Sequence, residues 1–133
     1  MLVFGTANPE GISNSAYKGV YLTEQDLQDL LPGINGVGVK VEHKGPDIGK
    51  VVSSWIHNGR LDVVMEIDEK ILQGAFARSF IENGLCKELS LGYSAEMQCS
   101  KAEGLVVKKK KVLEVSVVKK GARHNCQIHA WSK

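Results

Sequence analysis

Cysteine is scarce in this sequence, and its spacing argues against two common kinds of small domain. The chain of 133 residues has three cysteines, Cys86, Cys99 and Cys126, an odd number with no Cys-x-x-Cys pair. A disulfide framework needs paired cysteines, and a four-ligand zinc site normally contains such close pairs. We therefore expect neither, and a reducing compartment is the simplest location.

Long hydrophobic runs are also absent. No uninterrupted apolar segment approaches the roughly 20 residues of a membrane span. The first residues, MLVFGTANPEG, lack a basic stretch followed by a long apolar run. We expect no membrane association and an intracellular location, cytosolic or nuclear.

Neither sign of charge is in large excess, because the chain has 17 Lys and Arg residues and 15 Asp and Glu residues. This balance gives no general argument for nucleic-acid binding. The hydrophobic fraction of 43% is ordinary for a globular protein and excludes a chain that is disordered throughout. We expect a single domain over residues 1–133, either complete or the N-terminal part of a longer precursor.

Short segments rich in Val and Ile dominate what is present, and they predict strands. The expected strands cover residues 2–6, 19–22, 37–42, 48–56, 61–67, 88–98, 105–107 and 112–119. Asn58-Gly59 lies between two of them and favours the positive φ angles of a tight hairpin turn. We therefore expect a hairpin over residues 51–67.

Two helices are expected between the strands. In TEQDLQDLLPG, Thr23 and Asp26 form a capping box, and Pro32-Gly33 ends the helix. In DEKILQGAFARSFIENG, Asp68 is the expected cap and Asn83-Gly84 the left-handed stop. The second helix thus leads directly into the segment KELSLGYSA.

Alternation in KELSLGYSA, residues 87–95, predicts a half-buried strand with Leu89 and Leu91 on its apolar face. The polar face carries Glu88, Ser90, Gly92 and Ser94. Ser90 is either a nucleophile or an ordinary solvent-facing hydroxyl. This segment alone does not distinguish the two.

Histidine and glutamate occur in two further strand-like segments. His43 ends an apolar run in KVEHKGPDIGKVVSSW, and a histidine can act as general base toward a serine hydroxyl within hydrogen-bond reach. In KKVLEVSVVKKGARHNCQIHAW, Glu114 shares its expected face with Ser116 and Val118. A carboxylate there could orient an imidazole. Each residue taken singly is more often structural.

The order of these features resembles a known family. His43 is followed six residues later by Gly-x-Val, a helix leads into a Leu-Ser-Leu strand, and a later strand runs Glu-Val-Ser-Val-Val-x-x-Gly-x-Arg. Over residues 39–128 this pattern resembles the viral capsid-maturation serine proteases, which comprise the herpesvirus assemblin group and its prohead-protease relatives.

The resemblance implies roles for individual residues. It makes His43 the general base and Ser90 the nucleophile, in a chain order unlike that of better-known serine proteases. Herpesvirus enzymes have a second histidine where this chain has Glu114, whereas prohead-type relatives have an acidic residue there. Glu114 is therefore the expected third member, with His124 and His129 as competitors.

The oxyanion hole is also implied by the resemblance. The family's Gly-Arg-Arg motif is matched here by Gly121-Ala122-Arg123. Ala122 would offer its backbone amide to the oxyanion, and Arg123 would hold a water. No metal or organic cofactor is expected.

Together with the expected strands and helices, the resemblance implies an α+β fold. We expect a mostly antiparallel, barrel-like sheet flanked by two or more short helices. The implied activity is that of a serine endopeptidase that cleaves a scaffold or assembly protein, and itself, during virus capsid maturation. This would take place within the assembling procapsid, in the host nucleus if the virus is herpes-like.

A homodimer is also expected, although the chain lacks a counterpart of the long C-terminal helix through which herpesvirus enzymes dimerise. The apolar stripe at Phe76 and Phe80 could contribute to a dimer surface, but core packing is its expected use.

Two alternatives belong to other functional classes. One is a catalytically inactive, β-rich capsid-associated or protein-interaction module with the same fold. The other is a nucleic-acid-binding module that uses Lys108–Lys111 and Lys119-Lys120. An aromatic content of 6% disfavours stacking on single strands. The lysine run is more typical of a solvated hairpin end.

Overall fold

The computed structural model describes residues 1–9, 22–100, 104–121, 123 and 125–132, without the side chains of 95, 97–100 and 104–108. Most of the strand expected at 19–22 lies outside the described residues, as do Ala122 and His124.

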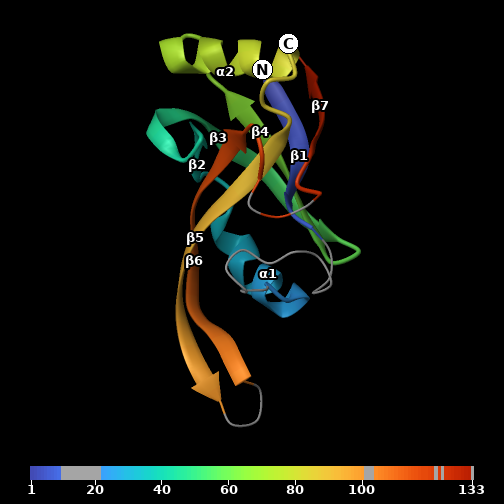
Figure 1. Cartoon of the computed structure of the whole chain (residues 1–133), viewed down its shortest axis with the longest axis vertical. Helices are drawn as coiled ribbons and strands as arrows, with labels where there is room; N and C mark the ends of the chain where they lie inside the picture. Colours follow the sequence, from blue (N-terminus) through green and yellow to red (C-terminus); the bar gives the residue numbers. More distant parts are fainter. Residues whose placement is uncertain (10–21, 101–103, 122, 124, 133) are drawn as a thin grey trace.

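Seven strands of the described chain form one curled, half-barrel sheet (Figure 1). They are β1 (Leu2–Asn8), β2 (Gly38–Val41), β3 (Lys44–His57), β4 (Arg60–Ile67), β5 (Glu88–Ser100), β6 (Gly104–Val118) and β7 (Ile128–Ser132). Their order is β5-β6-β2-β3-β4-β1-β7, and the pairs are antiparallel except for β2 with β6, which is parallel. The expected α+β class with a mostly antiparallel, barrel-like sheet is confirmed.

The curl brings the two ends of the sheet together. The backbone N–H of Leu89 in β5 donates to the carbonyl of Cys126 at 2.7 Å, and that of Ile128 donates to the carbonyl of Lys87 at 2.9 Å. The segment that leads into β7 therefore pairs with the start of β5. Strand β7 was not expected from the sequence. This pairing fixes the chain immediately before Ser90.

Strands β5 and β6 extend together beyond the rest of the sheet, away from α2 (Leu72–Glu82), as Figure 1 shows. Lys108–Lys111 lie inside β6 and not at a hairpin end, because β6 is continuous where the sequence predicted two strands. The Lys110 ammonium contacts Asp26 at 3.1 Å and Asp29 at 2.8 Å in the first helix, and these carboxylates raise its pKa. Lys110 thus ties the hairpin to that helix.

A bulge in β6 changes one predicted face. Gly92 pairs with Glu114 and Tyr93 pairs with Val112, so Leu113 is an extra residue between two pairs. Leu113 is 55% exposed, whereas Val112 is buried and takes the position that strict alternation with Val115 and Val117 would give Leu113. Glu114 keeps its predicted face.

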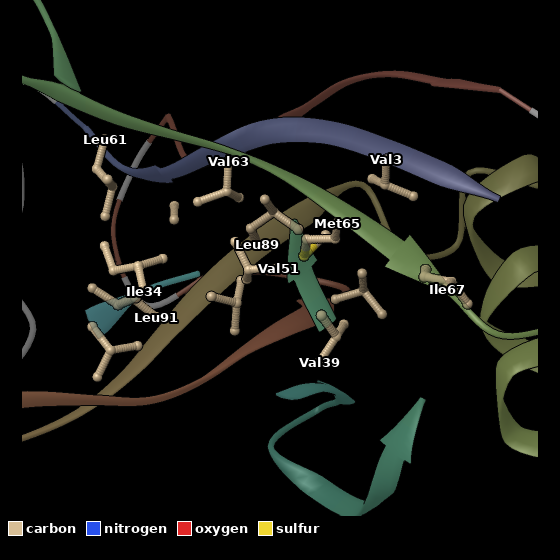
Figure 2. Close-up of a cluster of buried hydrophobic side chains, with 14 of the residues drawn as sticks. Val3, Ile34, Val39, Val51, Leu61, Val63, Met65, Ile67, Leu89 and Leu91 are labelled. Carbon is tan, nitrogen blue, oxygen red and sulfur yellow. The ribbon is translucent and has the colours of Figure 1, made fainter. Parts of the chain in front are cut away.

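The core lies inside the curl of the sheet. Figure 2 shows buried side chains that meet there from β1 to β5, among them Val3, Val39, Val51, Leu61, Val63, Met65, Ile67, Leu89 and Leu91. Burial of these side chains stabilises the sheet, because fully burying one apolar side chain contributes roughly 1.5–3 kcal/mol.

The first helix, α1 (Glu24–Leu30), begins as predicted. Thr23 and Asp26 form the reciprocal capping box, and a short 3-10 turn (Leu31–Gly33) with Pro32 follows. Leu27 and Leu30 are buried against the core. None of the described helices is long and apolar enough to cross a membrane.

The second helix, α2, differs from its prediction at two points. It begins at Leu72 without a side-chain cap, because the Asp68 carboxylate accepts a bond from the Lys70 N–H and closes a separate turn before the helix. Its buried face is Gly74, Ala77 and Ile81. Phe76 is 53% exposed and stacks on Phe80, so core packing was the wrong expectation for Phe76.

Candidate active site

Four small or polar residues share one face of the β5–β6 pair. In the register of the two strands, Ser90 lies opposite Ser116 and Gly92 lies opposite Glu114. Leu89 and Leu91 are buried on the other face, as the alternation predicted. Ser90 itself is only 5% exposed, so it is not the solvent-facing hydroxyl of the alternative interpretation.

Gly92 makes room for the Glu114 side chain. A Cβ atom at Gly92 would lie 2.1 Å from Glu114 Oε1, far inside van der Waals contact. Because Gly92 has no side chain, the carboxylate can lie over β5 near Ser90. Glu114 is 9% exposed in this position.

His43 reaches the same face from a two-residue turn between β2 and β3. Val41 pairs with Lys44, and the two residues between them, Glu42 and His43, have φ angles of 51° and 59°. Positive φ at both central residues is the type I′ hairpin turn, which normally takes Asn-Gly. Left-handed backbone costs roughly 1–2 kcal/mol for a residue with a side chain. The apolar run predicted a strand through Glu42, so this turn was not expected from the sequence.

The His43 ring joins Ser90 to Glu114. Its Nε2 lies 2.9 Å from Ser90 Oγ, and its Nδ1 lies 2.5 Å from Glu114 Oε1. A carboxylate only accepts hydrogen bonds, so Nδ1 carries the proton and Nε2 is left to accept the proton of the Ser90 hydroxyl. The His43 side chain is 44% exposed, which leaves the ring accessible from solvent. The arrangement has the geometry required for nucleophilic catalysis by serine.

Ser116 lies in the middle of this cluster, although the sequence analysis gave it no role. Its Oγ donates to Glu114 Oε2 at 2.6 Å and accepts from the backbone N–H of His43 at 3.0 Å. The available signal was its place two residues after Glu114, on the same strand face.

The expected oxyanion residues follow β6 in the sequence. Ala122 is outside the described residues. The preceding Gly121 packs closely on β5: a Cβ there would lie 2.7 Å from the carbonyl oxygen of Leu89, the residue before Ser90. Arg123 is buried, and its Nη2 donates to the Tyr93 hydroxyl at 3.2 Å. Gly121 thus lies next to the residue that precedes Ser90, and the Arg123 guanidinium contacts the Tyr93 hydroxyl.

Of the two competing histidines, the structure describes His129, which lies away from the cluster. His129 lies on β7, where its Nε2 is 2.7 Å from the Thr6 hydroxyl. That hydroxyl donates in turn to the buried Asp62. His124 lies outside the described residues. Glu114 is therefore the residue that meets His43 Nδ1.

The two described cysteine thiols are unsuited to act as nucleophiles. Cys86 and Cys126 are free and buried. Burial raises the pKa of Cys126 to about 12 and also raises that of Cys86. Near neutral pH both stay as thiols, which are poor nucleophiles. Within the residues that the structure describes, no group of three or more His, Cys, Asp or Glu side chains could hold a metal ion.

No protein-family model matches the chain, and no curated protein matches it.

Proposed function

We propose that this protein is a serine endopeptidase in which Ser90 is the nucleophile, His43 the general base and Glu114 the residue that orients His43. The observation that carries the proposal is the His43 ring, whose two nitrogens lie within hydrogen-bond distance of Ser90 Oγ and Glu114 Oε1. Such serine, histidine and carboxylate constellations recur on unrelated folds and are recognised by geometry.

The chemistry follows from the positions of the protons. His43 Nε2 takes the hydroxyl proton as Ser90 Oγ forms a bond to the scissile carbonyl carbon. The protonated ring then gives that proton to the leaving amine as the C–N bond breaks, and an acyl-enzyme remains. Water, deprotonated by His43, then attacks the acyl carbon. The bond between this carbon and Ser90 Oγ breaks, the acid product leaves, and protonated His43 returns its proton to Ser90 Oγ. Glu114 stabilises the imidazolium throughout and keeps Nδ1 protonated.

The negative charge of the tetrahedral intermediate needs a donor. By the motif resemblance this is the backbone amide of Ala122, with a water held by Arg123. The close packing of Gly121 on the Leu89 carbonyl supports a position of that turn beside the nucleophile. One preorganised donor contributes roughly 3 kcal/mol to lowering the barrier.

The substrate class rests on the resemblance of the motifs. We propose that the enzyme cleaves a scaffold or assembly protein, and its own precursor, inside the assembling procapsid of a virus. We also propose a homodimer. The exposed apolar side chains Leu72, Phe76 and Leu85, on and just after α2, give a candidate dimer surface. Concentration-dependent sedimentation measures whether such a dimer forms.

The test is cleavage of a mixed peptide library at high protein concentration, with products identified by mass spectrometry. We expect defined internal cleavage sites, lost in Ser90→Ala by about 10⁴-fold or more. The matched control is Ser94→Ala, which removes an exposed hydroxyl from the same strand face. It should cleave at the wild-type rate.

Two results would overturn the proposal. Cleavage by folded Ser90→Ala would remove Ser90 from the mechanism. No cleavage and no self-processing by folded wild-type protein would favour the catalytically inactive module instead.

A further inference from the structure

The Glu42–His43 turn needs contacts that hold it in its left-handed conformation. Neither residue is glycine, yet both have positive φ angles. Non-glycine residues in this region persist where the surroundings over-determine them, and they cluster at functional sites. Here one of the two turn residues, His43, is itself the candidate general base.

The contacts on this turn come from one stretch of β6 and the residue after it. The Glu42 N–H donates to the Val117 carbonyl at 3.1 Å, and the Glu42 carboxylate accepts from the Lys119 N–H at 2.8 Å. The His43 N–H donates to Ser116 Oγ at 3.0 Å. The His43 backbone is thus held by a side-chain hydroxyl and not by a carbonyl of the sheet.

That hydroxyl has a second partner in the same site. Ser116 has one proton, which it donates to Glu114 Oε2 at 2.6 Å, while its oxygen accepts the His43 N–H. The other Glu114 oxygen, Oε1, meets the His43 ring. A closed path therefore runs from the His43 backbone through Ser116 and Glu114 to the His43 ring.

Burial indicates that the hydroxyl is there for its hydrogen bonds. Ser116 is 0% exposed and lies between Val115 and Val117, which are buried apolar residues. A buried hydroxyl is costly unless it is hydrogen-bonded. The hydrogen bonds of this hydroxyl with Glu114 and with the His43 backbone both join it to residues of the candidate site.

We propose that Ser116 is a positioning residue of the active site, which turns Glu114 Oε1 toward His43 Nδ1 and fixes the His43 backbone over β6. It acts through His43 and Glu114. This inference rests on the proposed function, because it explains how the general base of that mechanism is oriented.

The experiment compares Ser116→Ala and Ser116→Cys with the wild type. Cysteine fills nearly the same space but is a weak hydrogen-bond donor, so it separates hydrogen bonding from packing. One readout is the rate at which a fluorophosphonate forms an adduct on Ser90, followed by mass spectrometry across neutral pH. The other is the NMR signal of the His43 Nδ1–H proton, assigned by its loss in His43→Ala. Ser54→Ala is the control. Ser54 lies on β3, away from the site, and its hydroxyl donates a hydrogen bond to Asn35.

We expect the fluorophosphonate to label Ser90 about 10-fold more slowly in both Ser116 variants, because His43 is no longer aligned with the Ser90 hydroxyl. The Nδ1–H signal should move or broaden, and Ser54→Ala should change neither readout. Thermal unfolding identifies the folded variants, and if Ser116→Ala does not fold, Ser116→Cys decides.

A folded variant that labels within about twofold of the wild-type rate, with an unmoved Nδ1–H signal, would overturn the positioning role. Absence of a Ser90 adduct in the wild type would overturn the proposed function instead. In that case the Nδ1–H signal alone still decides whether Ser116 orients the His43–Glu114 pair.

Discussion

Two hairpin turns of this protein share one backbone geometry but differ in the residues that form it. Asn58 and Gly59 connect β3 to β4 with φ angles of 52° and 76°, and His57 pairs with Arg60 across the turn. Glu42 and His43 connect β2 to β3 with φ angles of 51° and 59°. Asn-Gly is the preferred pair for such a turn, whereas Glu-His is not.

The difference lies in what holds each turn. Asn58-Gly59 adopts its conformation by local preference alone. The Glu42–His43 turn depends on contacts from residues 116–119, which are more than 70 positions away in the sequence. A turn held in this way presents an imidazole where a glycine would be easier to accommodate. This placement is understandable if the imidazole has a function.

The largest expected effect on Ser90 labelling comes from substitutions of His43, and two of them distinguish the loss of the imidazole from the strain of the turn. His43→Ala and His43→Gly both remove the imidazole, so fluorophosphonate labelling of Ser90 should fall by about 10³-fold or more in each. They differ only by a Cβ atom at positive φ. His43→Gly should therefore be more stable than His43→Ala by about 1 kcal/mol, measured by denaturant unfolding. Equal stability of the two variants would contradict the strain assigned to this turn.

A smaller effect is expected from displacing Glu114, the carboxylate that meets the His43 ring. In Gly92→Ala the new methyl group would overlap Glu114 Oε1, and the flexible carboxylate must move away from His43. Labelling of Ser90 should slow by about 10–100-fold with little loss of stability, because misorientation of a general base is costly to the rate.

The control for Gly92→Ala is Gly33→Ala, where an added Cβ would meet nothing within 4 Å. It should label at the wild-type rate. If Gly92→Ala did so as well, the position of Glu114 would have no bearing on Ser90.

A smaller effect is expected from the outer residue of the strained turn. Glu42→Ala removes the acceptor of the Lys119 N–H, whereas Glu42→Gln keeps an oxygen there. The alanine variant should lose about 1 kcal/mol of stability and label Ser90 several-fold more slowly, since one hydrogen bond holding the turn is lost. The glutamine variant should lie close to the wild type, and a loss as large as that of alanine would refute the role of this bond.

The smallest effect on activity is expected at the other turn. Gly59→Ala places a side chain at a φ angle of 76° and should cost about 1–2 kcal/mol of stability, measured by thermal unfolding. Labelling of Ser90 should be unchanged, because this turn contributes nothing to the site. A slowed label in folded Gly59→Ala would mean that general destabilisation, and not local geometry, governs the site.

Features with a local physical cause were predictable from the sequence. The capping box of Thr23 and Asp26, the Asn58-Gly59 turn and the strand face of Ser90 all follow from residue preference or two-residue periodicity. The grouping of His43, Ser90 and Glu114 was anticipated only through the resemblance of the motifs.

Features set by distant contacts were not predictable. The Glu42–His43 turn has no turn-forming residue, and the bulge that turns Leu113 outward depends on how β5 pairs with β6. The pairing of the segment before β7 with β5 is likewise tertiary. Propensity and alternation describe single segments, and these features arise between segments.

The most direct test of the central claim, that His43 activates Ser90, is the reaction of concentrated, folded protein with a fluorophosphonate, followed by mapping of the adduct by mass spectrometry. We expect a single adduct on Ser90 that is lost in His43→Ala and retained in Ser94→Ala. An adduct on Ser90 that forms equally fast in His43→Ala, or no adduct on the wild type at any concentration, would contradict it.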